Sequence, residues 1–419
     1  MIGNRKIPWS NILIYIIMIC AFLPKLLINE GTNIYVPEIF LFLGIIFFGY
    51  RQFLAYKEQK LLLIMFSSIL FFSIVAQINI ADFSSILKSF KELLYIPIIY
   101  WASRIKNRDK VLKHLVLIGC IALVINLGFY ITNFSQENTI WSGAESLSSG
   151  MSNRAFDLST LKLVQLPGLA HGIWGSYCVL IFIVACSLYS NKKINLTLFL
   201  TVVFLFSVNM VISVSREALL ILSLILFSYL WMPQRKNIYK FVIIFCTVGL
   251  IAGVWLYGES LPIVQKLVYT ANSVSADGTE GNIQLRLNTW AAYFQFIGEN
   301  LQYFFAGLGL SPDNFYNHVK YFSEGQIVSV PESALVYMQA YGGLLSSISI
   351  VILFWIAYKQ INTRSEYKLI KYFFLGILVT NLFSSVSMFS DLLYAHLCLV
   401  YGLVVLNNAF YEKGNTYIG

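Results

Sequence analysis

The chain has 419 residues, of which 58% are hydrophobic and only 12% are charged. Because water-soluble domains carry roughly 25% charged residues, this composition excludes a soluble fold. A formal net charge of +9 would suit nucleic acid, but the basic residues lie where membrane topology would put them, so no nucleic acid partner is expected.

Hydrophobic runs recur along the whole chain. A membrane-spanning helix needs about 20 mainly apolar residues, and twelve runs are candidates. They cover approximately residues 9–28, 35–54, 61–79, 84–102, 111–133, 166–190, 195–212, 216–232, 238–258, 331–357, 367–387 and 390–410. The runs are long and unbroken, whereas barrel strands alternate in polarity over about ten residues, so helices are favoured. The sequence therefore predicts an all-α polytopic membrane protein with about twelve transmembrane helices.

The distribution of basic residues predicts the orientation of the chain in the membrane. With the N-terminus placed inside, 20 of the 29 Lys and Arg residues fall on the cytoplasmic side and 9 outside, as the positive-inside rule expects. Both termini are then cytoplasmic, and nine spans in 1–258 are separated from three in 331–419 by a large outer loop at 259–330. The first run follows Arg5 and Lys6 but lacks an A-x-A-like cleavage site, so we interpret it as a retained span.

The segment 195–232 must fold back on itself. As one helix it would measure about 57 Å, nearly twice the roughly 30 Å hydrocarbon core. Its only polar break is at residues 213–217, which places Arg216 at or just beneath the outer surface. The positive-inside rule disfavours an arginine there, so topology does not explain this residue.

Inside the outer loop, apolar residues recur at helical spacing after a flexible turn at 276–282. The repeat has spacings of 4, 3, 4, 3 and 4 residues and consists of Ile283, Leu287, Trp290, Phe294, Ile297 and Leu301. This pattern predicts an amphipathic helix that either lies along the outer membrane surface or caps the bundle. Arg286 lies on an adjacent face of the same helix. A helix that only packs and is solvated is the alternative.

Several cations lie at or near the predicted outer side: Lys88, Lys91, Arg154, Lys162, Arg216 and Arg286. Such cations suit an anionic ligand at the outer leaflet, and arginine in particular binds phosphate oxygens in a bidentate fork. For the lysines, snorkelling at a helix end is the structural alternative. For Arg216 and Arg286 the functional interpretation is preferred.

Glu332 begins the span that follows the outer loop. The helix dipole favours a carboxylate there, which is the structural explanation, and a general base at the membrane surface is the functional one. His318 lies in the loop and His171 begins the sixth span, and no two histidines have metal-ligand spacing. All six cysteines lie inside hydrophobic runs, so neither a metal site nor a redox site is expected.

The order of these features resembles the O-antigen polymerase and O-antigen ligase superfamily of bacterial surface-polysaccharide enzymes. The resemblance covers nearly the whole chain, through the number of spans and the position of the large loop. The matching motifs are Ser213-Val214-Ser215-Arg216, Arg286-x-x-x-Trp290, Gly307-Leu308-Gly309, Pro331-Glu332-Ser333 and Tyr341-Gly342-Gly343.

The resemblance implies a metal-independent, cofactor-free glycosyltransferase that acts on undecaprenyl-diphosphate-linked glycans at the outer side of the bacterial inner membrane. Family arginines that match Arg216 and Arg286 hold the diphosphate. In the ligases, the position of Glu332 is usually a histidine of a His-Asn pair that activates the acceptor hydroxyl. Here Glu332-Ser333 stands in its place, which favours a polymerase.

Such a polymerase transfers the growing glycan from its lipid carrier to the non-reducing end of a new lipid-linked repeat unit. Breaking the glycosyl–phosphate bond builds negative charge on the diphosphate, which Arg216 and Arg286 would stabilise, while Glu332 would accept the acceptor proton. The residues expected to assist in substrate binding are Lys88, Lys91, Arg154, His171 and His318. The expected partners are the lipid-linked oligosaccharide, the bilayer and, as a candidate, a chain-length regulator protein.

Two alternatives stay open. A ligase of the same superfamily would join the glycan to a lipid A core. A flippase or secondary transporter can also have twelve spans, but transporters place ionisable residues and broken helices near the bilayer midplane, often in repeated halves. Here the spans are mostly free of charge and the sequence contains no visible repeat.

Overall fold

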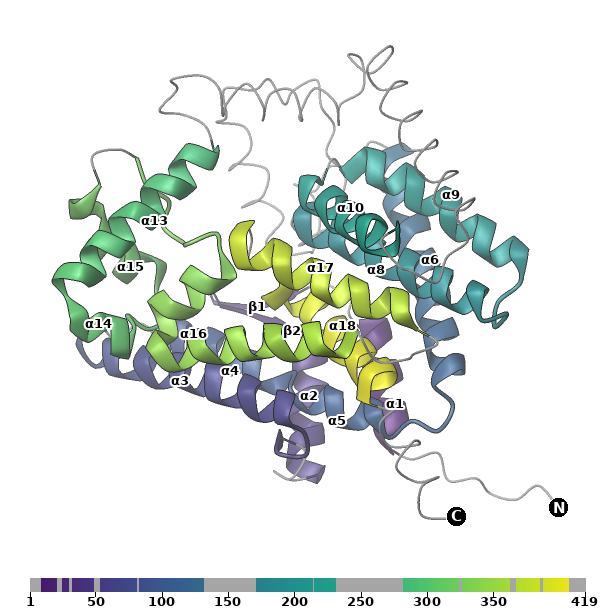
Figure 1. The fold of residues 1–419 in the computed structure, drawn as a ribbon. Helices are drawn as coiled ribbons and strands as arrows, with labels where there is room; N and C mark the ends of the chain where they lie inside the picture. Colours follow the sequence, from purple (N-terminus) through teal and green to yellow (C-terminus); the bar gives the residue numbers. More distant parts are fainter. Residues whose placement is uncertain are drawn as a thin grey trace, which may run out of the picture.

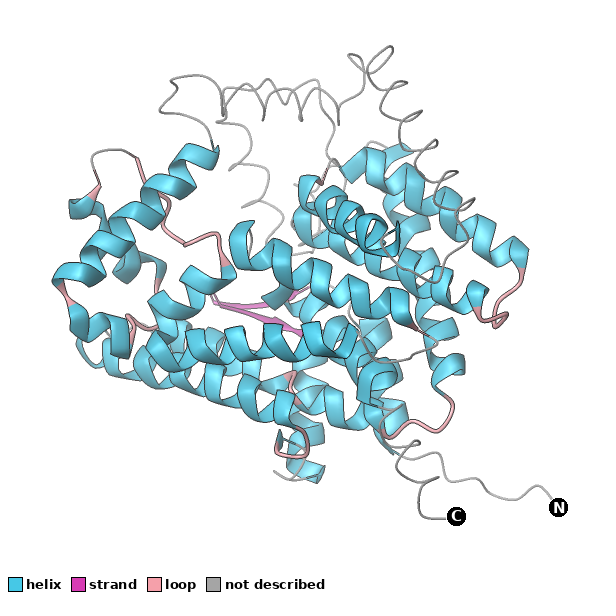
Figure 2. Ribbon diagram, in the orientation of Figure 1, coloured by secondary structure: helices cyan, strands magenta, loops and turns pink. Residues whose placement is uncertain are grey.

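A computed structural model shows that the protein is almost entirely helical (Figures 1 and 2). The structure describes residues 9–20, 25–29, 32–48, 53–80, 83–131, 171–213, 215–230, 282–323, 326–361, 367–384 and 387–406. The predicted span at 238–258, the first part of the outer loop at 259–281 and both termini lie outside these residues. Within the described chain, the predicted helical fold class is confirmed apart from one small hairpin.

The first part of the described chain ends at residue 131. Its helices are α1 (Trp9–Cys20), α2 (Val36–Phe48), α3 (Lys57–Ile80), α4 (Phe83–Leu94), α5 (Pro97–Ser103) and α6 (Arg108–Ile131). Between α1 and α2, the strands β1 (Lys25–Asn29) and β2 (Thr32–Tyr35) form an antiparallel hairpin. The first two predicted spans therefore meet at a hairpin, which the length of the hydrophobic runs did not reveal.

The second part begins at residue 171 and contains longer helices and short helical turns. Its elements are α8 (His171–Ser190), α9 (Leu196–Ser213), α10 (Arg216–Leu230), α13 (Asn282–Glu299), α14 (Leu301–Ala306), α15 (Pro312–Val319), η5 (Lys320–Phe322), α16 (Ala334–Ile361), α17 (Lys368–Ser384), η6 (Ser387–Phe389), α18 (Asp391–Tyr401) and η7 (Gly402–Leu406). The fold-back predicted within 195–232 is confirmed as the pair α9 and α10. The helix predicted in the outer loop is α13.

Four of the described helices are long and apolar enough to cross a membrane. They are α3, α6, α8 and α16, over Lys57–Ala76, Arg108–Gly128, Gly172–Ser190 and Ala334–Lys359. These apolar helices indicate a membrane protein. The count of twelve spans, and the side of the membrane on which the large loop lies, stay predictions.

The predicted span at 84–102 is divided into the two short helices α4 and α5. The division falls at Tyr95 and Ile96, directly before Pro97. Proline has no N–H and clashes with the preceding turn of an α-helix, so it favours a new helix start at this point. The N–H groups of Ile98 and Ile99 bond to carbonyls only three residues back, at 3.2 and 3.3 Å.

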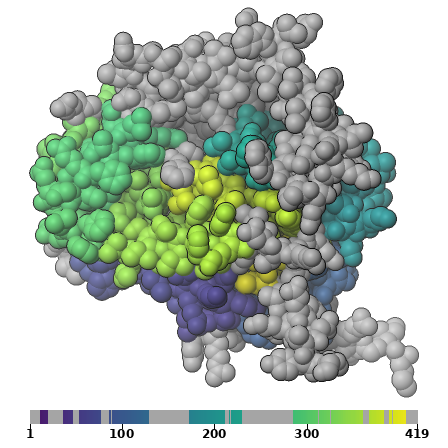
Figure 3. All heavy atoms as spheres, in the orientation of Figure 1, coloured from purple at the N-terminus to yellow at the C-terminus, as the bar shows by residue number. Residues whose placement is uncertain are grey.

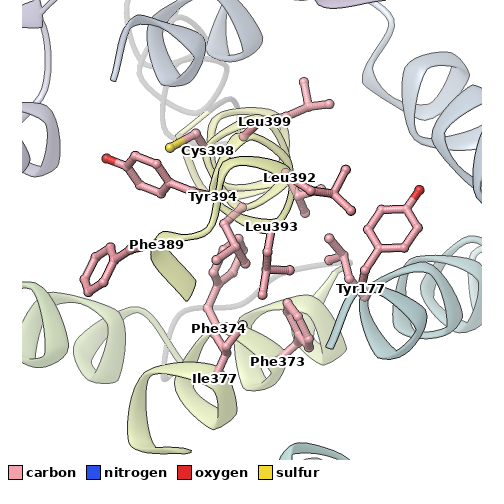
Figure 4. Packing of buried hydrophobic residues seen from close by; sticks show 14 of the residues in the cluster. Tyr177, Phe373, Phe374, Ile377, Phe389, Leu392, Leu393, Tyr394, Cys398 and Leu399 are labelled. Carbon is pink, nitrogen blue, oxygen red and sulfur yellow. The ribbon is translucent and has the colours of Figure 1, made fainter. Parts of the chain in front are cut away.

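α18 lies at the centre of the bundle and contacts α5, α8 and α1. Figure 4 shows buried side chains around it, including Leu392, Leu393, Tyr394, Phe373, Phe374, Ile377 and Tyr177. Lipid is as apolar as leucine, so in a bilayer such contacts stabilise the bundle through close van der Waals packing. This packing joins α17 and α8, two helices whose ends carry site residues.

Basic residues gather at one end of the bundle. Asp109, in the first turn of α6, pairs with Lys193 at 2.8 Å and accepts a hydrogen bond from the Tyr367 hydroxyl at 2.5 Å. Arg108 lies over the Tyr367 ring at 5.0 Å. Because α8 ends and α17 begins at this basic end, the start of α8 and the end of α17 lie at the opposite end.

α16 is interrupted by a break at Gly343, where φ is 66° and ψ is −160°. The Gly307-Leu308-Gly309 segment fills this break with its own backbone. Leu308 N donates to Ala340 O at 2.6 Å, and Gly309 N donates to Tyr341 O at 3.1 Å. The carbonyls that the break removes from the α16 hydrogen-bond ladder therefore find partners in the loop. In the sequence this Gly-Leu-Gly segment is one of the motifs of the family resemblance, and its spacing did not indicate the contact with α16.

The same segment also contacts α3. Gly309 has a φ of 73°, and a Cβ atom there would lie 2.6 Å from Phe72 O. Next along the chain, Leu310 N donates to Ser73 Oγ at 2.8 Å. Only glycine combines this backbone conformation with such a close approach. The outer loop is thus held against two of the candidate membrane spans.

Candidate functional site

Arg286 of α13 and Glu332 form an ion pair. Residues 326–333 run back along α13, where Val328 N donates to Thr289 Oγ1 at 3.0 Å. Arg286 lies about one helical turn before Thr289 on the same face, so its guanidinium reaches the Glu332 carboxylate. The two side chains are 24% and 35% exposed, but the oxygen that forms the pair, Glu332 Oε2, is itself buried.

Glu332 lies two residues before the start of α16. Ser333 caps this helix, since Val336 N donates to its Oγ at 3.4 Å and Tyr337 N donates to its carbonyl at 2.8 Å. The Ser333 hydroxyl also donates to Leu382 O, near the end of α17. A carboxylate beside a helix N-terminus is stabilised by the helix dipole. The hydrogen bonds of Ser333 therefore hold the backbone next to Glu332 in place.

Arg216 is the first residue of α10, and its side chain lies outside the described residues. The helix start itself is well anchored. Ser215 is buried and caps α10, because Ala218 N donates to its Oγ at 3.2 Å. Glu217 Oε1 accepts hydrogen bonds from Asn381 Nδ2 at 3.2 Å and Ser176 Oγ at 3.4 Å.

The last turn of α17 brings the starts of α10 and α16 together. Asn381 bonds to Glu217, the neighbour of Arg216, and Leu382 bonds to Ser333, the neighbour of Glu332. Arg216 and Glu332, which the sequence singled out in separate motifs, therefore each lie next to a residue that is bonded to the last turn of α17. Helix N-termini carry partial positive charge and unsatisfied N–H groups, so two of them at one place suit an anionic ligand.

Only part of the apolar face predicted for α13 is buried. Ile297 is buried and Trp290 is half-buried, whereas Leu287 and Phe294 are exposed. The buried side centres on Tyr293, whose ring lies 5.8 Å from that of Phe315. Burial raises the pKa of the Tyr293 phenol, and the nearby Gln339 amide opposes part of this shift. The phenol is therefore neutral at physiological pH.

His318 and Lys91 have contacts away from the Arg286–Glu332 pair. The His318 ring packs against Phe296 and Tyr303, with centroids 5.7 and 5.6 Å away, inside the cluster of loop helices. Lys91 Nζ lies 3.1 Å from an oxygen of Glu38, a carboxylate that is only 4% exposed. These contacts explain both residues structurally, and their roles in substrate binding stay predictions.

The remaining predicted site residues are described in part or not at all. Lys88 lies in α4 and His171 begins α8, but their side chains lie outside the described residues. Arg154 lies outside the described residues altogether.

Sequence reasoning missed Asn381, Glu38 and the pairing of Glu217. A signal for Asn381 was present, because a polar residue within an apolar span usually has a partner inside the bundle. The capping residues Ser215 and Ser333 could also have been found from the sequence, since Ser directly before an apolar run marks a helix start. Nothing in periodicity or spacing indicates that residues as far apart as 217 and 381 meet.

Comparison with family models, curated proteins and solved structures finds no match to this chain. Among the described residues, no group of three or more His, Cys, Asp or Glu side chains could hold a metal ion.

Proposed function

We propose that the protein is a polymerase of O-antigen or a related capsular polysaccharide, embedded in the bacterial inner membrane with about twelve spans. It would take a glycan from undecaprenyl diphosphate and add it to a lipid-linked repeat unit, without a metal or cofactor. The observation that carries the proposal is the ion pair of Arg286 with Glu332 beside the start of α16. Two residues singled out on separate chemical grounds meet there.

The proposed reaction uses the two members of this pair differently. The acceptor hydroxyl oxygen attacks the anomeric carbon, the bond from that carbon to the diphosphate breaks, and the acceptor proton passes to Glu332. The electron pair of the broken bond stays on the diphosphate, whose charge Arg216 and Arg286 stabilise. A guanidinium has five N–H donors in a planar fork, so Arg286 can hold the carboxylate and a phosphate oxygen together.

The position of the pair supports a substrate carried in the membrane. Arg286 is held by loop helices that are bonded to α16 and α3, two of the candidate spans. The basic residues around Asp109 lie at the other end of the bundle, which the positive-inside rule assigns to the cytoplasm. The first contact keeps the pair beside the membrane, and the charge pattern favours the outer side, where lipid-linked repeat units are assembled.

The proposal is tested by charge reversal as well as by removal. Arg216→Ala, Arg286→Ala and Glu332→Gln are each expected to abolish long-chain polysaccharide while membrane levels of the protein stay normal. The double variant Arg286→Glu with Glu332→Arg can rebuild an ion pair but places a carboxylate at the diphosphate, so it is expected to stay inactive. Lys320→Ala is the matched control, a loop cation that lies against Tyr316 and Tyr321.

Restored chain length in the reversed double variant would show that the pair is only structural. Normal long chains in all three single variants would show that the site assignment is wrong. A chain-length effect in Lys320→Ala alone would place the important cation elsewhere in the loop.

A ligase is separated from a polymerase by the products that accumulate when the gene is deleted. Loss of a polymerase leaves single repeat units attached to the core. Loss of a ligase leaves bare core and glycan stranded on the carrier.

The break in α16 favours a transporter, because transporters use broken helices to build substrate sites. In those sites the unwound backbone lines a cavity. Here the carbonyls of Ala340 and Tyr341 are occupied by the N–H groups of Leu308 and Gly309. Loss of a flippase would leave the lipid-linked repeat unit on the cytoplasmic side, so single repeats on the core would exclude this alternative.

A further inference from the structure

α13 and α14 expose large apolar side chains on one edge, which we call the loop stripe. It consists of Leu287, Phe294, Leu301 and Phe305, which are 47%, 55%, 65% and 59% exposed. On α13, Ala291 and Gly298 are also exposed, so its exposed positions follow spacings of 4, 3 and 4 residues, and on α14 Leu301 and Phe305 lie four residues apart. Such spacing keeps side chains on one edge of each helix. A soluble surface rarely carries so regular an apolar row without something covering it.

The candidate span α16 has an exposed apolar face of its own beyond its break. Leu345, Ile348, Val351 and Trp355 are 59%, 46%, 52% and 54% exposed. In a helix that crosses a membrane, this is the face that lipid covers. At its far end, Lys359 lies 4.9 Å from the Trp355 ring, a combination of residue types that marks a membrane–water interface.

α14 continues this lipid-facing surface at the break in α16. Gln339 Nε2 donates to Phe304 O at 2.6 Å, and a Cβ atom at Gly343 would lie 2.8 Å from the carbonyl carbon of Phe305. Phe305 and Leu345, both exposed, thus stand on backbone segments in direct contact. Figure 3 shows the surface of α13–α15 bordering that of α16, with α3 beside them.

The length of α16 sets the depth at which α14 lies. From Gly343 to Lys359 the helix rises about 24 Å at 1.5 Å per residue. The hydrocarbon core is about 30 Å thick, so with Lys359 at one boundary the break falls within a few ångströms of the other. α14 adjoins that break and therefore lies at the boundary between acyl chains and headgroups.

We infer that the loop stripe is inserted into the leaflet that faces the outer loop, as an interfacial amphipathic edge covered by lipid. The residues beside the stripe are polar and exposed, namely Gln295, Glu299 and Gln302, and they face water. The loop helices are then partly inserted in the membrane and do not lie wholly in water above it. Arg286, on another face of α13, is held at the level of lipid headgroups. This inference does not depend on the proposed enzymatic function.

The test compares neighbouring positions on the same helix. In a background without the six native cysteines, nitroxide labels are placed singly at Phe294→Cys, Leu301→Cys, Gln295→Cys and Gln302→Cys. Adjacent helical positions point about 100° apart, so each apolar position has its own polar control. The full chain is reconstituted in phosphatidylethanolamine–phosphatidylglycerol vesicles. Collision rates are measured with molecular oxygen, which concentrates in lipid, and with a water-soluble nickel chelate.

Labels at 294 and 301 are expected to show a several-fold higher oxygen-to-nickel ratio than labels at 295 and 302. Equal ratios, with ready access of nickel to all four positions, would show that the stripe lies in water and would overturn the inference. Low access of both reagents at 294 and 301 would also overturn it, because the stripe would then be covered by protein, such as a second copy of the chain. Spectra are compared with those of the labelled chain in detergent micelles, which remove the bilayer while keeping the fold.

Discussion

Two ion pairs involve residues singled out in the sequence, and they differ in burial. Arg286 and Glu332 are 24% and 35% exposed, whereas Lys91 and Glu38 are 17% and 4% exposed. A solvent-accessible pair contributes at most about 1 kcal/mol to stability. Removing one member of a buried pair leaves an uncompensated charge and costs about 3–5 kcal/mol. The second pair is the more buried of the two and holds α2 against α4.

Lys91→Met is expected to lower the free energy of unfolding by about 3 kcal/mol, since the buried Glu38 carboxylate loses its cation and keeps the hydrogen bond from the Tyr95 hydroxyl at 3.3 Å. Glu332→Gln is expected to lower it by about 1 kcal/mol, because both side chains of that pair are partly exposed. Denaturant unfolding in detergent micelles, followed by tryptophan fluorescence, measures both changes. Lys91→Arg keeps the charge and serves as the control. A Lys91→Met variant of normal stability that no longer binds substrate would instead assign Lys91 to the site.

At the residue scale, the sequence could indicate chemistry but not contacts. Arg286 and Glu332 were each predicted on the ground of residue type and position near a membrane surface. Their pairing depends on how residues 326–333 return along α13, which periodicity does not encode. Asn381 was missed for a similar reason, because its partner Glu217 lies on another helix.

Among the elements, α16 departs most from a simple span. Its break at Gly343 has a positive φ, and the backbone of Phe305 and Ala306 lies against the glycine. The break allows the Gly-Leu-Gly segment to bond with α16, so it attaches the outer loop to the bundle. The shape of the site therefore depends on a glycine well separated in sequence from Arg286.

Gly343→Ala is expected to destabilise the fold by more than about 2 kcal/mol, since it adds a positive-φ penalty to steric overlap with backbone atoms. Gly298→Ala is the control, because a Cβ at Gly298 would meet nothing within 4 Å. Gly298 lies in the last turn of α13, where the higher helix propensity of alanine should raise stability by less than about 1 kcal/mol. Thermal unfolding in detergent measures both. If the two variants unfold at the same temperature, the close packing at the break is not present in solution.

Hydrophobic patterns predicted some of the helix boundaries correctly and missed others. The fold-back between α9 and α10 followed from length alone, because one helix of that length cannot fit the bilayer. The division into α4 and α5 was missed, since run length ignores the effect of Pro97 on the helix. The exposure of Leu287 and Phe294 could not be read from spacing, because a lipid-facing edge and a core-facing edge have the same apolar pattern.

At the scale of the whole molecule, the two ends of the bundle differ in charge. The basic end contains Arg108, Lys193 and the turn before α6 with Lys106, and Asp109 joins its helices through Lys193 and Tyr367. The loop helices α13–α15 lie at the other end (Figure 1). Lys and Arg near span ends are retained in the cytoplasm during insertion. The basic end is therefore expected to face the cytoplasm, and the Arg286–Glu332 pair the outside.

Single cysteines in a cysteine-free chain test this orientation. Lys106→Cys lies in the exposed turn between α5 and α6, and Asp313→Cys lies at the exposed start of α15. In intact spheroplasts, a membrane-impermeant maleimide is expected to label Asp313→Cys at once and Lys106→Cys only after permeabilisation, because the positive-inside rule retains the basic turn inside. The reverse pattern would place Arg286 and Glu332 in the cytoplasm. A polymerase acting on outward-facing lipid-linked glycans would then be excluded, whatever the single-residue variants showed.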